Sequence, residues 1–450
     1  MTKYNNYLRK DPFSPFSQLN IEPKFYKNIL VPIINSFAEP YQDKRTEHSS
    51  EEFSLVMFLN ALLGYSPNTG TQIMEHRLIS LLRGKTEKYI KQTRILPHPS
   101  QMNKYSHEFS MEDTDNKLLE INRKVLKTLR EYGMIPRNIK IAFDFKKQLY
   151  YGEKDNPHVI GILAEKGTKK AFKWHTCVVI LKGVELQIGS IMIQKGEKKE
   201  FFIQKMIEYL ESLGFTVELS VMDREYYSKV VFKYLDSKGV TYITPVKGSK
   251  SLNAKKEEAL KAPKKRVQDY NMKDGYEPGN GYNYFTHKVG FYAKRKKNFN
   301  KLRAQYKNKT RKKEEILCDI FVLASNQEFS APIVKEKYKF YKIRGDYGDR
   351  WRIETSYREV IPFVTYSTSK IPEVRNLYFI IALLLYNLWV IVNIFLHKKK
   401  PWLSKEPKAF FTIYLQDVFL LALQMRIGAD PPDSEFCRTE ELKIMGCIII

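Results

Sequence analysis

The spacing of hydrophobic positions along the chain changes from a helical to a strand-like pattern near residue 139. Upstream, apolar residues recur at helical spacing in three stretches, 50–63, 71–82 and 113–132. The first stretch follows Ser49, has acidic residues in its first turn and ends at Gly64, all of which are typical of helix ends. The residues before it are rich in proline and predict an irregular arm with one short helix near 25–37. We therefore expect a helical N-terminal domain over residues 1–135.

Downstream, short runs rich in β-branched and aromatic residues alternate with amphipathic stretches. Strands are predicted at 139–145, 172–181, 185–193, 217–223 and 240–245, and helices at 200–213 and 227–235. The sequence Lys182-Gly183-Val184 is typical of a hairpin turn between the second and third strands. The order of three strands, helix, strand, helix and strand predicts an α/β core, whose first part spans residues 136–247.

A basic segment interrupts the core pattern at residues 248–316. Glycines and aromatic residues are interleaved there with runs of lysine and arginine, and an apolar strand follows at 316–325. We expect a basic, β-rich insertion at 248–316, a second part of the core at 317–425 and a C-terminal tail at 426–450. The basic runs favour contact with a polyanion, although a solvated basic loop with ordinary sheet aromatics would have the same composition.

Three acidic residues lie in positions that favour a chemical role. Asp144 and Asp223 each end a strand-like apolar run, where a carboxylate is unfavourable unless it is paired or binds a cation. Glu354 lies between Arg350 and Arg358 at the i, i+4 spacing of one helix face, a spacing that exposed ion pairs would also produce. Three carboxylates from two strands and a helix would suit a hard, oxygen-preferring cation.

Together and in this order, the motifs resemble the catalytic set of DDE insertion-sequence transposases, which have an RNase H-like core. Asp144, Asp223 and Glu354 match the three acidic residues, and Tyr347, Arg350 and Glu354 match the spacing of the Tyr-x2-Arg-x3-Glu signature. The run from Asp223, Asp-Arg-x-Tyr-Tyr-Ser, is similar to the second motif of the family. The resemblance covers roughly residues 139–400, and it implies an RNase H-like mixed sheet with the insertion placed before the glutamate helix.

The resemblance implies an enzyme that cuts DNA at the ends of an insertion element and transfers the strand in cut-and-paste transposition. The three carboxylates would hold two Mg²⁺ or Mn²⁺ ions, which activate water and stabilise the leaving 3′ oxygen. The implied partners are double-stranded DNA at the terminal inverted repeats, target DNA and a second copy of the chain. The helical domain at 1–135 would bind the DNA ends, although a solvated basic face would have the same residues. Arg350 is expected to orient Glu354 or to contact the scissile phosphate. Further DNA contacts are expected from Tyr347, Arg358, Arg224, Lys264, Lys265, Arg266, Lys294, Arg295, Lys296 and Lys297.

One position departs from the family pattern. Ile361 stands where the family usually has a lysine, and Lys370 or Arg358 are the candidates to replace its phosphate contact. Two other functions therefore stay open: a DDE-like endonuclease without transposition, and a catalytically inactive DNA-binding relic.

The composition agrees with a folded protein that has a polyanionic partner. Hydrophobic residues make up 43% of the chain, and its formal net charge of +26 favours nucleic acid, although an anionic membrane or ribosomal RNA would satisfy the same charge. The cysteines are scattered, so neither a structural zinc site nor a disulfide framework is expected. The N-terminus lacks the apolar core of a signal peptide, and we expect a cytoplasmic, nucleoid-associated protein of a prokaryote.

Some residues have two possible roles. The apolar stretch 377–396 is nearly long enough to cross a membrane, but Asn387 and Asn393 interrupt it, and we expect a buried helix and no membrane partner. His175 is expected to pack in the core rather than bind a metal. Trp351 is likewise expected in the core rather than stacked on DNA.

Overall fold

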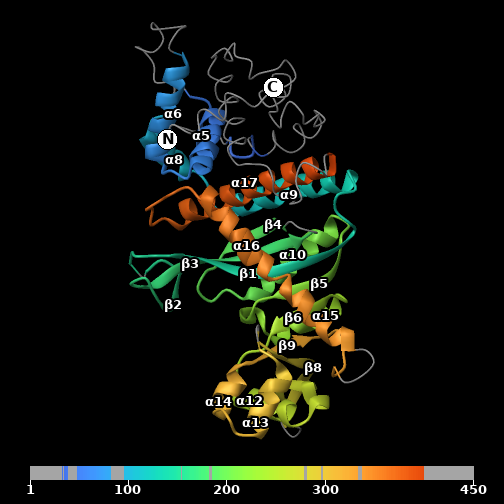
Figure 1. Cartoon of the computed structure of the whole chain (residues 1–450). Coiled ribbons are helices and arrows are strands. Elements are labelled where there is room, and N and C mark those ends of the chain that lie inside the picture. The colour runs from blue at the N-terminus through green and yellow to red at the C-terminus, as the bar shows by residue number, and fades with distance from the viewer. Residues whose placement is uncertain are drawn as a thin grey trace, which may run out of the picture. The chain divides into compact units, whose positions relative to one another are not determined.

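The computed structural model describes two compact units, which are presented separately (Figure 1). Unit 1 comprises the described residues of Met1–Ile135, Leu186–Ser190 and Tyr357–Ile450, and unit 2 those of Pro136–Glu185 and Ile191–Ser356. The structure describes residues 33, 35–38, 48–82, 96–153, 155–181, 185–277, 281–294, 297–332 and 337–399. Most of the helix predicted near 25–37, the turn predicted at 182–184 and the tail at 426–450 lie outside these residues.

Unit 1 contains the helices predicted from the N-terminal part of the sequence. Its helices are α5 (Ser50–Leu63), α6 (Pro67–Leu82), α8 (Pro99–Ser106), α9 (Met111–Glu131) and α17 (Pro372–Lys399). The Ser49 hydroxyl accepts from the Glu52 N–H at 3.3 Å, and the Glu52 carboxylate accepts from the Ser49 N–H at 3.2 Å. Gly64 then ends α5 at φ 67°, a left-handed conformation that favours glycine. The predicted start and end of this helix are confirmed.

The apolar stretch 377–396 lies in α17, which runs beside α9 (Figure 1). Within the described part of the chain, α17 is the one helix long and apolar enough to cross a membrane, and 89% of that apolar window is buried in the structure. Asn387 donates to Asn122 Oδ1 at 3.0 Å and to the Gln187 carbonyl at 2.7 Å. Because its asparagine is paired inside the unit, α17 has the character of a buried core helix.

Unit 2 is built on a mixed sheet. The strands are β1 (Asn138–Leu149), β2 (Val159–Glu165), β3 (Thr168–Ile180), β4 (Glu185–Met192), β5 (Thr216–Met222), β6 (Thr241–Pro245), β7 (Val267–Glu277), β8 (Gly281–Ala293) and β9 (Ile320–Ser325). In the described residues the sheet has nine strands in the order β2-β3-β1-β5-β6-β9-β8-β7, with β4, whose residues Leu186–Ser190 are assigned to unit 1, off this path. β1 pairs antiparallel with β3 and parallel with β5, and β5 pairs parallel with β6. The predicted α/β class with a mixed sheet is confirmed.

The helices of the core fall where the sequence predicts them. α10 (Lys199–Ser212) lies between β4 and β5 in the chain, and α11 (Lys229–Ser237) between β5 and β6. The predicted order of three strands, helix, strand, helix and strand is therefore present, with β2 as an additional strand. Gly214 follows α10 at φ 77°, as expected for the residue that stops a helix.

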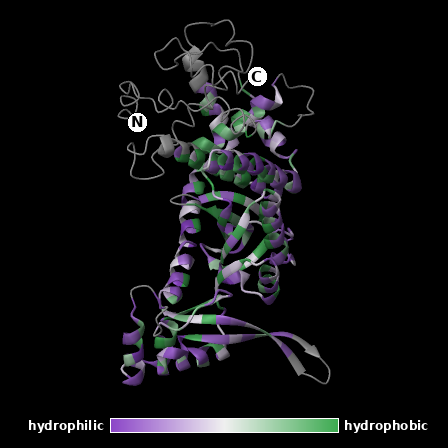
Figure 2. Cartoon of the chain, turned by 90° about the vertical axis from the view of Figure 1, so that its right-hand side faces the viewer, coloured by the Kyte–Doolittle hydropathy of each residue, from purple (hydrophilic) through white to green (hydrophobic). Residues whose placement is uncertain are grey.

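The basic insertion contains a β-hairpin and three helices. The hairpin of β7 and β8 extends the core sheet, because β8 pairs antiparallel with β9. The helices are α12 (Lys250–Lys261), α13 (Phe299–Lys307) and α14 (Lys313–Cys318). Figure 2 shows that these helices are mostly hydrophilic. The strand predicted at 316–325 begins only at Ile320, because the preceding residues end α14.

Candidate active site

Alternation along β1 places Asp144 on the opposite face of the sheet from its two neighbours. Phe143 and Phe145 point to the face covered by α10 and Tyr226, where Phe143 packs against Phe202 at 5.9 Å and Phe145 stacks on Tyr226 at 4.6 Å between ring centroids. Asp144 therefore points to the other face, where it is 7% exposed. Its Oδ1 accepts from the Phe145 N–H at 2.8 Å.

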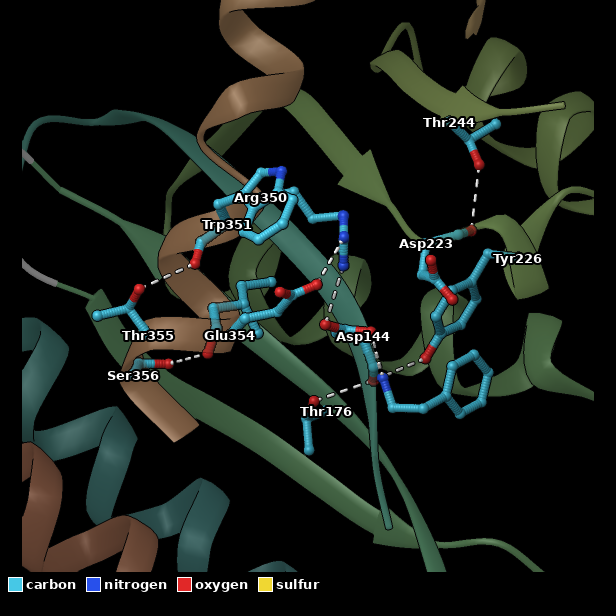
Figure 3. A network of polar contacts seen from close by, with 12 residues as sticks. Asp144, Thr176, Asp223, Tyr226, Thr244, Arg350, Trp351, Glu354, Thr355 and Ser356 are labelled. Carbon is cyan, nitrogen blue, oxygen red and sulfur yellow. Dashed lines mark hydrogen bonds and ion pairs between the residues drawn. The ribbon is translucent and has the colours of Figure 1, made fainter. Parts of the chain in front are cut away.

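Asp223 stands one residue beyond the end of β5. Its N–H donates to the carbonyl of Phe143 at 3.2 Å, which continues the parallel pairing of β5 with β1. The Asp223 carbonyl accepts from the Thr244 hydroxyl of β6 at 3.1 Å. These contacts hold the second acidic residue next to the first (Figure 3).

Glu354 comes from a helix that is shorter than the sequence predicts. The spacing of Arg350, Glu354 and Arg358 predicts one helix that includes all three, but α15 (Lys337–Gly348) ends and α16 (Trp351–Val360) begins after a two-residue turn at residues 349–350. The Gly348-Asp349 pair has low helix propensity, which explains the break. Arg350 therefore lies in the junction, while Glu354 lies in the first turn of α16.

The Arg350 guanidinium lies between two of the three carboxylates (Figure 3). Its Nη1 is 3.2 Å from Asp144 Oδ2, and its Nη2 is 2.7 Å from Glu354 Oε1. Only 9% of Arg350 is exposed, and its Nε has no hydrogen-bond partner among the residues that the structure describes. The guanidinium also lies over the Tyr347 ring, 5.6 Å from its centroid. The Arg350–Glu354 pair predicted from the spacing is therefore only partly buried, whereas the contact of Arg350 with Asp144 on β1 is buried.

The carboxylates of the site interact electrostatically. Burial raises the pKa of Asp144 to about 6, against the opposing effects of Arg350 and the Phe145 N–H, and the charges of Asp223 and Glu354 raise it further. Lys146, two residues along β1 on the same face, is half-buried, and burial lowers its pKa while the Asp144 charge opposes this. The site therefore holds more negative than positive charge, and an added cation would be favourable there.

Behind Asp144, a hydrogen-bond network fixes the backbone of β1. The Asp144 carbonyl accepts from the Thr176 hydroxyl at 3.0 Å and from the Tyr226 hydroxyl at 3.3 Å. His175 Nδ1 lies 3.0 Å from the same Tyr226 hydroxyl and its ring stacks on Phe202. The expectation that His175 is a packed core residue is confirmed. The sequence did not indicate Thr176 or Tyr226, although Tyr226 lies within the Asp-Arg-x-Tyr-Tyr-Ser run.

One prediction about a residue near the site is wrong, and two residues that are predicted to contact DNA are buried in this structure. Trp351 is 57% exposed, because α16 turns Ile353 inward and leaves Trp351 on the opposite side. Tyr347 was expected to contact DNA, but its ring is buried between Arg350 and Phe321, and burial raises its pKa to about 12. Arg266 was expected to contact DNA as well, but it is buried inside unit 2.

Arg266 has contacts that account for its burial. Its Nε donates to the Phe291 carbonyl at 3.1 Å, and its guanidinium lies 4.1 Å from the Phe299 ring centroid and 4.7 Å from that of Phe340. The other cations predicted to contact DNA and described by the structure are exposed: Arg224, Lys264, Lys265, Lys294, Lys297 and Arg358. Arg295 and Lys296 lie outside the described residues.

The donors at the site suit a hard cation, but they do not enclose one as they stand. Carboxylate oxygens are the ligands that Mg²⁺ and Mn²⁺ prefer, and Asp144, Asp223 and Glu354 supply them on one sheet face. Among the described residues, however, no three His, Cys, Asp or Glu side chains lie close enough together to hold a metal ion. The Arg350 guanidinium occupies the place between Asp144 and Glu354.

The fold and site define a mixed α/β protein with three acidic residues and one arginine gathered beside its central strands. No family model and no curated protein sequence matches the chain. Among solved structures, the chain is similar to a piggyBac transposase synaptic complex with hairpin DNA, with a TM-score of 0.49 and 11% sequence identity over 97% of this chain and 87% of that chain. A likeness of this extent does not assign a function, so the proposal below is based on the geometry of the site.

Proposed function

We propose that the chain is a DDE-type DNA transposase, which cuts a phosphodiester bond at the end of an insertion element and joins the freed 3′-OH to target DNA. The observation that carries the proposal is that Asp144, Asp223 and Glu354, from three motifs far apart in the sequence, lie near enough for the charges of Asp223 and Glu354 to act on Asp144. Arg350 links Asp144 to Glu354, at 3.2 Å and 2.7 Å, and Asp223 is held beside Asp144 by the pairing of β5 with β1. The strand order β3-β1-β5-β6 around these residues also suits an RNase H-like core.

Asp144, Asp223 and Glu354 are the residues that would hold Mg²⁺ or Mn²⁺. When bound, such ions activate a water for attack on the phosphodiester and stabilise the leaving 3′ oxygen. The chain itself fixes the position of Asp144 through the hydrogen bonds to its carbonyl and carboxylate. Burial of the Asp144 side chain excludes water from that side of the site and strengthens its attraction for a cation.

Residues around the acidic cluster suit a DNA strand. Trp351 follows Arg350 directly and exposes most of its indole, so a base that leaves the duplex beside the cut would have an aromatic surface to stack on. Arg224 follows Asp223 and is exposed, which suits contact with a neighbouring phosphate.

The insertion supplies further positive charge for DNA. Lys264, Lys265, Lys294 and Lys297 are exposed there, and the whole chain has a formal net charge of +26. Each lysine set against a phosphate releases a counterion, so binding to DNA would weaken steeply with salt. Bringing two element ends together would require a second copy of the chain, and we include a dimer in the proposal.

An endonuclease that cuts DNA without joining it is the second candidate. Ile361 favours it, because the resemblance expects a lysine at this position and the isoleucine side chain is 52% exposed, where a phosphate-binding group would be useful. Joining of a cut end to target DNA separates the two candidates.

The proposal is tested with purified protein and supercoiled DNA that carries the flanking ends of the element, in Mg²⁺, Mn²⁺ or EDTA. Breaks at the element boundary are expected with either metal and not with EDTA, and they should disappear in the Glu354→Gln variant. Cleavage that is insensitive to EDTA, or equal in the variant, would reject the proposal. Sequence-selective retardation of the terminal repeats, in contrast to unrelated DNA, would distinguish a transposase from a general nuclease.

A further inference from the structure

The position between two of the proposed metal-binding carboxylates is taken by a side chain of the protein itself. Arg350 donates through Nη1 to Asp144 and through Nη2 to Glu354, and the guanidinium is buried. A divalent cation held by both carboxylates would compete with the guanidinium for their negative charge and their oxygen atoms, since carboxylates bind Mg²⁺ through oxygen and Asp144 Oδ1 already accepts from the Phe145 N–H. The guanidinium also occupies the place between Asp144 and Glu354.

Arg350 is also held in a way that allows it to leave. It lies in the turn between α15 and α16, where its N–H donates to Tyr347 and its carbonyl accepts from Ile353, both over three residues rather than four. Its side chain could therefore move without breaking the hydrogen bonds within either helix. Its buried Nε has no partner among the described residues, which is an unfavourable arrangement for a donor.

We propose that Arg350 is an exchangeable counter-ion: it closes Asp144 and Glu354 to metal in the DNA-free chain, and a DNA phosphate draws it away so that the metal can bind. The inference rests on the proposed function. A guanidinium binds phosphate through two parallel hydrogen bonds, so a phosphodiester offers Arg350 an anionic partner equivalent to the one it gives up.

Exchange would couple the two ligands in both directions. If Arg350 left alone, Asp144 would remain buried without a cation, and if metal entered alone, the guanidinium would lose both anionic partners. DNA should therefore raise the affinity for metal, and metal should raise the affinity for DNA by the same factor. The DNA-free chain would bind metal weakly and would load it only at a phosphodiester.

The experiment measures Mn²⁺ binding to the full chain by the electron paramagnetic resonance signal of free Mn²⁺, with and without a short duplex that carries the element end. Without DNA, Arg350→Gln is expected to bind Mn²⁺ roughly tenfold more tightly than the wild type, within the usual range of coupling between two ligands. Lys140→Gln is the matched control, because it removes one positive charge from β1, the strand of Asp144, at a position where Lys140 pairs with Asp346 at 3.1 Å. This control is expected to bind Mn²⁺ as the wild type does.

Addition of the duplex should tighten Mn²⁺ binding to the wild type and leave that of Arg350→Gln nearly unchanged. Equal Mn²⁺ affinities of the two proteins without DNA, or an equal response to DNA, would overturn the exchange while leaving the proposed function intact. If no protein binds Mn²⁺ even with DNA, both proposals fail. If Arg350→Gln melts at a much lower temperature than the wild type, Arg350→Lys replaces it, because lysine keeps the charge but cannot make two parallel hydrogen bonds. The expected increase in Mn²⁺ affinity is then smaller. The effect of DNA on Mn²⁺ binding to the wild type tests the exchange without any variant.

Discussion

Asp223 lies beside Asp144 because the backbone N–H of Asp223 donates to the carbonyl of the residue before Asp144, at 3.2 Å. This bond extends the parallel pairing of β5 with β1 by one position, so that two acidic side chains from distant parts of the chain occupy neighbouring positions. Glu354 then joins them through Arg350. The cluster is thus fixed by the sheet on one side and by an ion pair on the other.

The acidic cluster predicts substitutions that slow DNA cleavage but leave DNA binding nearly unchanged. Asp223→Asn and Glu354→Gln keep the size of each side chain but remove its charge, and each should slow metal-dependent DNA cleavage by roughly a hundredfold or more, equivalent to about 2.7 kcal/mol in activation free energy. Gel retardation should detect nearly unchanged binding of element-end DNA, because the positively charged surfaces are intact. Cleavage at the wild-type rate by either variant contradicts the assignment.

The hydrogen bond from Tyr226 to the Asp144 carbonyl, at 3.3 Å, predicts a modest effect on stability. Tyr226→Phe should lower the free energy of unfolding by about 1 kcal/mol, the usual contribution of one such bond, and should slow cleavage without changing DNA affinity. Tyr234→Phe is the matched control, because the buried Tyr234 hydroxyl has no partner among the described residues. Denaturant unfolding of both variants checks this, and equal losses in the two would exclude a special role for Tyr226.

His175 predicts how stability depends on pH. Burial lowers its pKa to about 3, helped by the charges of Lys173 and Lys199, whereas the unfolded chain has an ordinary histidine pKa near 6.5. The unfolded state therefore binds the proton first, and His175 destabilises the fold progressively as the pH falls below about 6.5, by about 2 kcal/mol at pH 5. His287, whose pKa burial lowers to about 4, adds a similar contribution.

The test compares the wild type with His175→Asn, whose amide can donate to Tyr226 in place of Nδ1–H. Denaturant unfolding between pH 7 and pH 5 should give a shallower fall in stability for the variant. It keeps the contribution of His287 and the opposing contribution of Asp144, whose pKa is raised to about 6 in the folded state, so that the folded chain binds that proton first. An identical fall in both proteins means that His175 is not the group that responds to pH.

Arg266 and Lys264 should separate packing from DNA binding within the basic insertion. Arg266→Ala removes a buried guanidinium with its hydrogen bond and two aromatic contacts, and it should cost about 2–4 kcal/mol of unfolding free energy. Lys264→Ala, at an exposed position, should change stability by no more than about 0.5 kcal/mol. It should instead lower the slope of log affinity against log salt for DNA by about 1. A large loss of stability in Lys264→Ala would contradict this division.

Local rules predicted much of the fold correctly. Ser49, Glu52 and Gly64 define α5 through their own backbone and side-chain bonds, so the sequence alone contains the information for both ends. The strands of the core were predicted because their buried residues form continuous apolar runs. The extra strand β2 is not predicted, because its residues show no alternation of polar and apolar types, with Glu165 as its one polar residue, although Gly161 and Leu163 are exposed in the structure.

The details of the site depended on tertiary contacts that spacing does not contain. The helical spacing of Arg350, Glu354 and Arg358 gives no sign of the turn at residues 349–350. Arg350 contacts Asp144 on β1 from that turn. The same pattern gave no reason to expect Trp351 at the surface. Arg266 is predicted to contact DNA because it belongs to a basic run. Its burial depends on an aromatic ring and a backbone carbonyl from other elements, which the run itself does not indicate.

The most direct test of the proposed function supplies an element-end duplex already cut to leave a free 3′-OH, together with supercoiled target DNA. With Mg²⁺ or Mn²⁺, the wild type should join the 3′ end to the target, whereas EDTA or the Asp144→Asn substitution should abolish the joined product. A wild-type protein that binds the duplex and cleaves DNA but never joins it would contradict transposition and would assign the acidic cluster to a nuclease.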